Sequence, residues 1–162
     1  MEVASDIVEP QLFNSPLEAG LRVIMILEAF SPKVFDLATL SLLDYFVVHT
    51  GDAGGPISIH PELEARAGEY FVRRRLVEEG VALMVRSFIL EQIRDENGIS
   101  YRSRETAAAM IDLMSCDYNT RLRDASEWLA RKAREDGLDH FIASLRGGIE
   151  RWTHEVTGEI PL

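Results

Sequence analysis

The first strong hydrophobic pattern along the chain predicts a buried helix from Pro16 to Phe30. Ser15 can cap its N-terminus, Pro16 suits the first helical position, and Glu18 can close a capping box. Apolar side chains occupy nearly every position from 21 to 30, so they face almost all sides of the helix. Such a helix needs cover from all directions, which predicts a central position in the fold.

A second helix of the same kind is expected over about 37–49, because Asp36 can serve as its N-cap and the segment is almost entirely apolar. Residues 50–61 are rich in glycine and proline, a composition typical of turns and loops. A helical period then returns over about 62–87 and contains Gly80. Because glycine costs about 1 kcal/mol relative to alanine within a helix, we expect a bend at Gly80 or the close approach of a neighbour.

Two short runs of β type, 88–94 and 99–103, flank the dipeptide Asn97-Gly98, and this pattern predicts a β-hairpin. A lone hairpin is marginally stable in water, so this one is expected to lie against the helices. Three helices followed by a hairpin is the element order of a winged-helix domain. The predicted fold class is therefore mainly α: a winged-helix-like domain of three helices plus a β-hairpin, with a C-terminal helical extension.

The remaining sequence predicts three more helices. The first opens at Ser103, and the second spans about 118–136 and ends at Gly137. The last helix carries apolar residues at alternating spacings of four and three, which is typical of a heptad seam: Leu138, Ile142, Leu145, Ile149, Trp152 and Val156. This seam can pack on the chain's own apolar helices or dock onto a partner helix, and both alternatives stay open.

These elements divide the chain into three parts. We expect a flexible N-terminal arm at 1–11, a winged-helix-like core at 12–115, and C-terminal helices at 116–157 that pack on the core or on a partner. The apolar runs are too short to cross a bilayer, and no signal-peptide pattern opens the chain. A cytoplasmic protein without membrane contact is therefore expected.

The acidic composition argues against DNA binding by this chain alone. Its 27 Asp and Glu residues outnumber 17 Lys and Arg residues, which leaves a formal net charge of −10. Sequence-independent affinity for DNA comes from Lys and Arg side chains that neutralise phosphates, so the chain as a whole repels DNA. A local basic face is still compatible with this average.

No catalytic motif is evident in the sequence. The chain lacks a nucleophile elbow, a phosphate-binding loop that ends in Lys-Ser or Lys-Thr, a His-Glu-x-x-His motif and a dinucleotide fingerprint. Cys116 is the single cysteine, which excludes an intrachain disulfide, and we expect it to be a buried, inert thiol. We therefore expect no enzyme activity, no catalytic residues, no cofactor and no metal site.

One alternative for metal chemistry is nevertheless conceivable. His49, Asp52 and His60 could approach one another around the glycine-rich loop, and a small metal-dependent enzyme built on them is a third functional class. Their spacing does not match a ligand motif. Structural roles, at a helix end for His49 and in a turn for His60, are the preferred interpretation.

The residues best suited to an interface are three arginines and two tryptophans. Arg73, Arg74 and Arg75 lie on the third predicted helix, the one that enters a DNA groove in domains of the helix-turn-helix type. Each arginine can instead pair with a glutamate four residues away, and the acidic hairpin tip would repel DNA. We therefore predict a self-paired or partner-facing surface there, with Trp128 and Trp152 as aromatic anchors for a partner.

Over about residues 12–115 the chain resembles a known family. The resemblance rests on short segments of the sequence: 12–22 (LFNSPLEAGLR), 27–30 (LEAF) with Pro32, 35–37 (FDL), 43–45 (LDY), 49–52 (HTGD) with 55–56 (GP), 73–74 (RR) with 76–80 (LVEEG), and 101–102 (YR). These segments are similar to the middle component of bacterial ABC-three-component systems, the small subunit of Lamassu-type anti-phage defence.

The resemblance implies a non-enzymatic subunit that assembles with an SMC-like ABC ATPase subunit and an effector subunit, often a nuclease. It implies a bridging role between the two and supplies no catalytic residues for this chain. Contact with DNA is then expected only through the complex. The runner-up class is a winged-helix DNA-binding transcription regulator, which would bind duplex DNA by itself.

Overall fold

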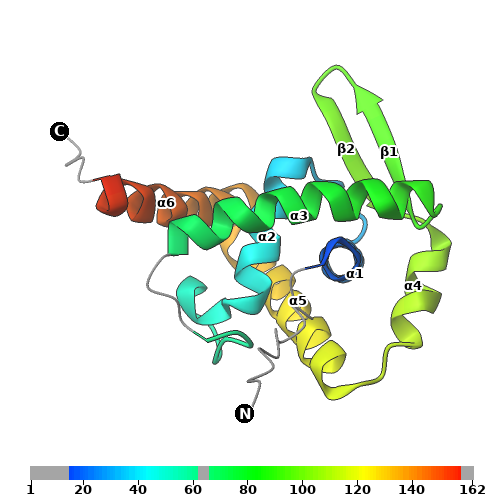
Figure 1. The fold of residues 1–162 in the computed structure, drawn as a ribbon, viewed down its shortest axis with the longest axis horizontal. Coiled ribbons are helices and arrows are strands. Elements are labelled where there is room, and N and C mark those ends of the chain that lie inside the picture. The colour runs from blue at the N-terminus through cyan, green and yellow to red at the C-terminus, as the bar shows by residue number, and fades with distance from the viewer. Residues whose placement is uncertain (1–14, 62–65, 158–162) are drawn as a thin grey trace, which may run out of the picture.

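Helices carry almost all of the fold, and one β-hairpin interrupts them, as the sequence predicts (Figure 1). The computed structural model describes residues 15–61 and 66–157. Within these residues lie six α-helices, a short 3₁₀ helix and two strands: α1 (Pro16–Ala29), α2 (Leu37–Val48), η1 (Thr50–Ala53), α3 (Arg66–Arg86), β1 (Leu90–Asp95), β2 (Gly98–Ser103), α4 (Glu105–Asp112), α5 (Asp117–Asp136) and α6 (Leu138–Thr157). The arm predicted at 1–11 and the predicted helix start at 62 lie outside the described residues.

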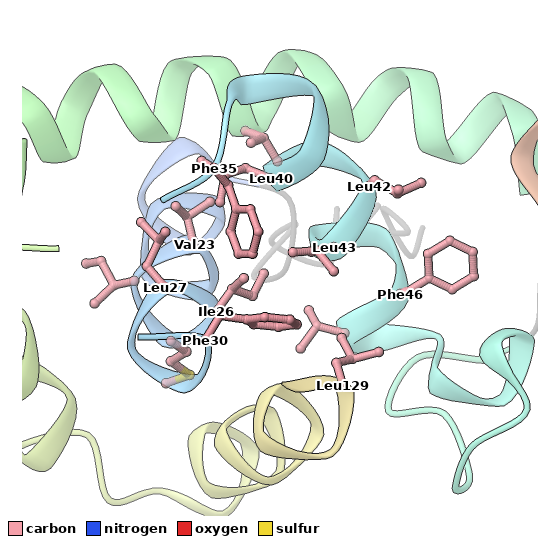
Figure 2. Packing of buried hydrophobic residues seen from close by; sticks show 14 of the residues in the cluster. Val23, Ile26, Leu27, Phe30, Phe35, Leu40, Leu42, Leu43, Phe46 and Leu129 are labelled. Atoms are coloured by element: carbon pink, nitrogen blue, oxygen red, sulfur yellow. The ribbon is translucent and has the colours of Figure 1, made fainter. Parts of the chain in front are cut away.

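Helices α1 and α2 are buried on nearly all sides, which confirms their predicted central position. α1 contacts α2, α3, α4 and α5, and α2 also contacts α3, α5 and α6. Their apolar side chains meet above α5, where Leu129 closes the cluster from below (Figure 2). Despite this apolar character, no helix in the described part of the chain is both long and apolar enough to span a membrane.

Both predicted N-caps are present. The Ser15 hydroxyl accepts a hydrogen bond from the backbone N–H of Glu18 at 3.2 Å. The Asp36 carboxylate accepts one from the backbone N–H of Thr39 at 2.8 Å. Each cap satisfies an N–H group that the helix itself leaves without a partner, so local signals place both helix starts correctly.

α1 and α3 cross at a pair of glycines, Gly20 and Gly80. A Cβ at position 80 would lie 2.5 Å from the carbonyl oxygen of Pro16 and 2.6 Å from the backbone nitrogen of Gly20. These distances are far shorter than van der Waals contact, so only glycine lets the two backbones approach so closely. Of the two explanations that the sequence allowed for Gly80, the close neighbour is present.

The hairpin has the predicted turn. β1 and β2 pair antiparallel, from Leu90 opposite Ser103 to Asp95 opposite Gly98. At the turn, the Asp95 carboxylate accepts a hydrogen bond from the backbone N–H of Asn97 at 2.8 Å, and Gly98 has a φ of 114°. Glycine suits this position because a positive φ strains residues that carry a Cβ.

The connection between α1 and α2 fixes the hairpin to the helices. Phe35 in this connection forms an antiparallel bridge with Tyr101 of β2, through backbone hydrogen bonds of 3.3 and 2.9 Å. The ring of Phe35 is buried and lies edge-to-face against Phe30, with ring centroids 5.2 Å apart. The hairpin is thus attached to the core, which confirms that it lies against the helices.

The last three helices begin close to their predicted positions, with one difference. Gly137, with a φ of 87°, separates α5 from α6 as predicted. α4, however, starts at Glu105 after Arg104 as its N-cap, not at Ser103. Ser103 stays in β2, where its hydroxyl donates a hydrogen bond to the Glu28 carboxylate of α1. A contact between distant segments therefore overrides the local capping preference of serine.

α5 and α6 pack on the core of the same chain. On α6, Leu145 and Ile149 of the predicted seam are buried, together with Phe141, which the heptad pattern missed. The side chain of Val156 lies outside the description. Up to Trp152, self-packing is therefore the alternative that the structure supports, and the helices at 116–157 share one core with the preceding elements.

Candidate functional site

A buried carboxylate, Asp44 of α2, lies between two buried arginines from different helices. Arg22 of α1 donates from Nε to Oδ1 of Asp44 at 2.6 Å. Arg73 of α3 donates from Nε to Oδ2 at 3.0 Å. All three side chains are almost completely inaccessible to solvent. One carboxylate thus connects the first three long helices.

Glu69 extends this arrangement along α3. Its Oε1 lies 3.6 Å from Nη1 of Arg73, and its Oε2 lies 3.0 Å from Nε2 of His49, the C-cap of α2. The ring of His49 meets that of His60 edge-on, with centroids 5.9 Å apart, and Nε2 of His60 forms a 2.8 Å hydrogen bond with the hydroxyl of Tyr118. We call the following residues the buried polar cluster: Arg22, Asp44, His49, His60, Glu69, Arg73 and Tyr118.

A second group of side chains borders the cluster near α6. The Tyr45 hydroxyl donates to Oδ2 of Asp52 at 2.8 Å, and Nη2 of Arg66 lies 3.2 Å from Oδ1 of Asp52. The guanidinium of Arg66 lies over the ring of Trp152, 5.1 Å from its centroid, a cation–π geometry. The carboxylate of Asp52 is therefore engaged by Tyr45 and Arg66.

The two carboxylates of the cluster are held in the ionised form. Burial alone would raise the pKa of Asp44, but the charges and hydrogen bonds of Arg22 and Arg73 outweigh it and lower that pKa. Burial also acts to raise the pKa of Glu69, whereas its interactions with His49 and Arg73 lower it by more. Two arginines and two carboxylates balance inside the cluster, and this pairing is what permits their burial.

His60 makes the stability of the fold sensitive to mild acid. Burial, followed by electrostatic interactions with Arg73, His49 and Arg22, lowers the pKa of His60 to about 4. In the unfolded chain this imidazole takes up a proton below a pH of about 6.5, whereas in the folded chain it stays neutral down to about 4. Protons therefore favour the unfolded state in this window, and the free energy of unfolding should fall as the pH drops from 6.5 to 4.

We expect this loss to be on the order of 1 kcal/mol, because solvent reaches part of the His60 ring and screens the interaction. Urea unfolding between pH 7.5 and 4.5 measures it. His60→Gln should flatten the slope between pH 6.5 and 4.5, while His140→Gln, at an exposed position of α6, should leave the slope unchanged. Equal slopes in wild type and His60→Gln would contradict the assignment.

In the described part of the chain, His49, His60 and Glu69 are the group that could hold a metal ion, since one donor atom of each lies within 4.8 Å of the others. The sequence hypothesis placed Asp52 in this group, and that was wrong because Asp52 bonds to other side chains. The charges of Arg73 and Arg22, which help to lower the pKa of His60, also oppose a divalent cation here. We therefore explain these contacts as hydrogen bonding and ion pairing that stabilise the fold.

The structure separates the three arginines that were predicted for an interface. Arg73 faces inward at the helical spacing of the other buried positions of α3 and pairs with Asp44, so it offers no surface to a partner. Arg74 and Arg75 are exposed, and Nε of Arg75 lies 3.4 Å from the glutamate four residues later, as the i,i+4 pattern predicted. A partner contact by Arg74 and Arg75 stays a prediction.

The two tryptophans are half-buried and have partners within the chain. Trp152 lies against Phe46 of α2, with ring centroids 6.0 Å apart. Trp128 of α5 packs on the loop at Gly55, where a Cβ would lie 2.5 Å from the indole. With Ile57 and neighbouring residues, Trp128 lines a surface groove of about 390 Å³. An anchoring role of either tryptophan stays a prediction.

The expectation of a buried thiol at Cys116 was wrong. Cys116 is exposed and precedes α5 as its N-cap, without a hydrogen bond from its side chain to the helix. It belongs to the connection between α4 and α5, which runs over the surface and also exposes Leu113. A connection of this kind offers no apolar environment for the thiol.

Arg22 and Asp44 were not predicted as site residues, and Glu69 was expected only as the i,i+4 partner of Arg73, a pair that the structure contains. One signal was available for the first two. Each interrupts a largely apolar helix, and Asp44 is the only charged residue of α2. Buried charges are rare unless they are paired, so opposite charges on two buried helices predict a pair. For Glu69, the helical i,i+4 spacing indicated the pair with Arg73 but not the contact with His49, which lies 20 positions earlier.

Comparison with known protein families gives a match over most of the chain. Residues 12–155 match the model of a family described as the ABC-three component (ABC-3C) system Middle Component 2. The match therefore includes the helices that carry the buried polar cluster and extends to α6. Comparisons with curated proteins and with solved structures give no match.

Proposed function

The chain belongs to the middle component 2 family of ABC-three component systems, and on this premise we propose that it is a non-catalytic subunit that bridges an SMC-like ABC ATPase and an effector nuclease. Membership in a multi-component system implies partner subunits. The proposed setting is Lamassu-type anti-phage defence in the cytoplasm. There, the subunit docks on the ATPase and restrains the effector until foreign DNA engages the complex.

The observation that supports the non-catalytic role is that the ionisable side chains of the buried polar cluster are paired or hydrogen-bonded with one another. Asp44 and Glu69 are paired with buried arginines, and His49 is hydrogen-bonded to Glu69. His60 contacts Tyr118 in the same cluster. Groups engaged in this way hold helices together, and this supports a subunit whose contribution to the complex is its surface.

The order of the elements supports a winged-helix-like core for this subunit. α1, α2 and α3 precede the hairpin, and the bridge between Phe35 and Tyr101 joins the hairpin to the α1–α2 connection. Recognition helices in DNA-binding domains present their side chains to a groove. Here Arg73 faces inward, and the exposed tip of the hairpin carries Asp95 and Glu96. We therefore propose that these elements make protein contacts and that DNA is met only through the complex.

Co-purification tests this proposal. The tagged chain, co-expressed with the products of its neighbouring genes, should retain an ABC-type ATPase and an effector on the affinity resin. The matched control is the same co-expression with the tag on an unrelated acidic protein of similar size. Absence of an ABC-type ATPase from the retained material would refute the bridging role.

The second candidate, a winged-helix DNA-binding transcription regulator, is favoured by the same element order. It makes a different prediction for the isolated chain: measurable binding to duplex DNA, with an affinity that falls steeply as the salt concentration rises. The bridging proposal predicts little or no duplex binding by the chain alone. A gel-shift titration of the purified chain at two salt concentrations distinguishes the two functions.

A further inference from the structure

Phe88 has an unfavourable backbone conformation in the turn between α3 and β1. Its φ is 58°, and it is the one residue other than glycine with a positive φ in the described part of the chain. This left-handed region crowds the Cβ of an L-residue against the backbone, and a bulky side chain there is a real outlier. The chain therefore places a large residue where the backbone disfavours it.

The local hydrogen bonds explain the backbone conformation at position 88 but not why a phenylalanine occupies it. The N–H of Phe88 bonds to the carbonyl of Val85 at 3.1 Å, and the N–H of Ile89 bonds to that of Met84 at 3.0 Å. These two bonds define a Schellman motif, whose left-handed position is usually glycine. The Thr106 hydroxyl of α4 also donates to the carbonyl of Phe88 at 3.3 Å, which fixes the turn in place.

The fold makes little use of the phenyl ring of Phe88. The residue is 72% exposed, so most of its apolar surface faces solvent. Single exposed apolar residues are common in proteins and need no explanation by themselves. At Phe88, however, exposure coincides with a backbone that favours glycine, so both the packing and the conformation of the chain are unfavourable. An outlier of this kind indicates a role outside the isolated subunit.

The surroundings of Phe88 are positively charged, in contrast to the chain as a whole. Arg86, the last residue of α3, precedes it, and Arg104, the N-cap of α4, donates its backbone N–H to the carbonyl of Ile89 at 2.9 Å. Both arginines are exposed, and neither forms an ion pair with a described residue. Two acids belong to these surroundings: Glu105 follows Arg104 in the sequence, and Glu91 of β1, whose pKa Arg104 helps to lower, is paired with Arg102 at 2.8 Å. Three positive charges therefore stand against two negative ones here, on a chain of net charge −10.

We propose that Phe88 is an aromatic anchor that inserts into an apolar pocket of a partner subunit, with carboxylates at the rim of that pocket facing Arg86 and Arg104. Figure 1 shows the corner concerned, where α3, the base of the hairpin and α4 meet, away from α6. The inference rests on the proposed function, since the family implies partner subunits. Aromatic and arginine side chains are the residues that dominate binding energy at protein interfaces.

Two variants at this position separate the anchor from a structural role. Phe88→Ala removes the ring but keeps a Cβ in the left-handed backbone, whereas Phe88→Gly removes both. We expect both variants to weaken the affinity of the purified chain for its partner subunit at least tenfold. We also expect Phe88→Gly to have a higher Tm than Phe88→Ala, and a Tm at or above that of wild type.

The partner subunits are purified from the co-expressed complex, and the dissociation constant for each is measured by biolayer interferometry. Phe71→Ala is the matched control, because it removes a half-exposed phenyl ring at the other end of α3 and should leave the affinity unchanged. Unchanged affinity in both Phe88 variants overturns the anchor while wild-type binding leaves the bridging role standing. Loss of duplex DNA binding with partner binding intact also overturns it, because the surface is then one for nucleic acid.

Discussion

Asp44→Ala should prevent stable folding of this chain. The substitution removes the one carboxylate that lies between Arg22 and Arg73, and both guanidinium groups would stay buried without the carboxylate to which both are hydrogen-bonded. Removal of one partner from a buried ion pair typically costs about 3–5 kcal/mol, and the net stability of a domain is about 5–15 kcal/mol. Circular dichroism and thermal unfolding should show a protein that is unfolded or melts far below wild type.

Asp112→Ala is the matched control for this substitution. Its carboxylate lies 3.5 Å from Arg123 on the surface, and such exposed pairs contribute at most about 1 kcal/mol. A combined variant tests the cause: Arg22→Met, Asp44→Leu and Arg73→Met together should recover much of the stability, because apolar side chains can replace a buried ion triad. An Asp44→Ala protein with a Tm close to wild type would contradict the role assigned to the buried polar cluster.

Gly80→Ala should destabilise the chain although alanine is the better helix former. The new Cβ would lie 2.5 Å and 2.6 Å from backbone atoms of α1, which cannot rotate away as a side chain can. α1 and α3 would have to separate, so we expect the overpacking to outweigh a gain in helix propensity of about 1 kcal/mol. The predicted net loss is about 1–3 kcal/mol, measurable as a decrease in Tm of several degrees.

Gly147→Ala on α6 is the matched control, and it should not lower the Tm. A Cβ at Gly147 would meet no atom within 4 Å, so the substitution adds helix propensity without a clash. Its Tm should equal or exceed that of wild type, and its free energy of unfolding should rise by up to about 1 kcal/mol. If Gly80→Ala and Gly147→Ala shift the Tm in the same direction, the close crossing of α1 and α3 is not what requires glycine at position 80.

Predictions of individual elements succeeded where the stabilising contact is local. The Ser15 and Asp36 caps each act on a backbone N–H three residues away, and the Asp95 side chain closes its turn two residues on. Ser103 shows the opposite case. Its hydroxyl bonds to Glu28, 75 positions earlier, and the residue stays in a strand although its chemistry suits a helix start.

Predictions of the candidate site were less successful, for a related reason. The three adjacent arginines of α3 look equivalent in the sequence, but a helix turns about 100° per residue and so directs them to different sides. Of these three arginines, only Arg73 reaches the Asp44 carboxylate, and its burial leaves it out of the surface that was predicted as an interface. Phe88 went unnoticed because its signal is a backbone dihedral angle, which no hydrophobic pattern reports.

Composition, apolar periodicity and capping residues were therefore enough to indicate a mainly helical chain with two central helices, one hairpin and no evident catalytic motif. The family resemblance over the first two thirds of the chain pointed to the same class of subunit as the match over 12–155. The buried polar cluster depended on three-dimensional packing. Its central pairs join residues 22 and 29 positions apart, and only the meeting of three helix faces determines which charges are buried together.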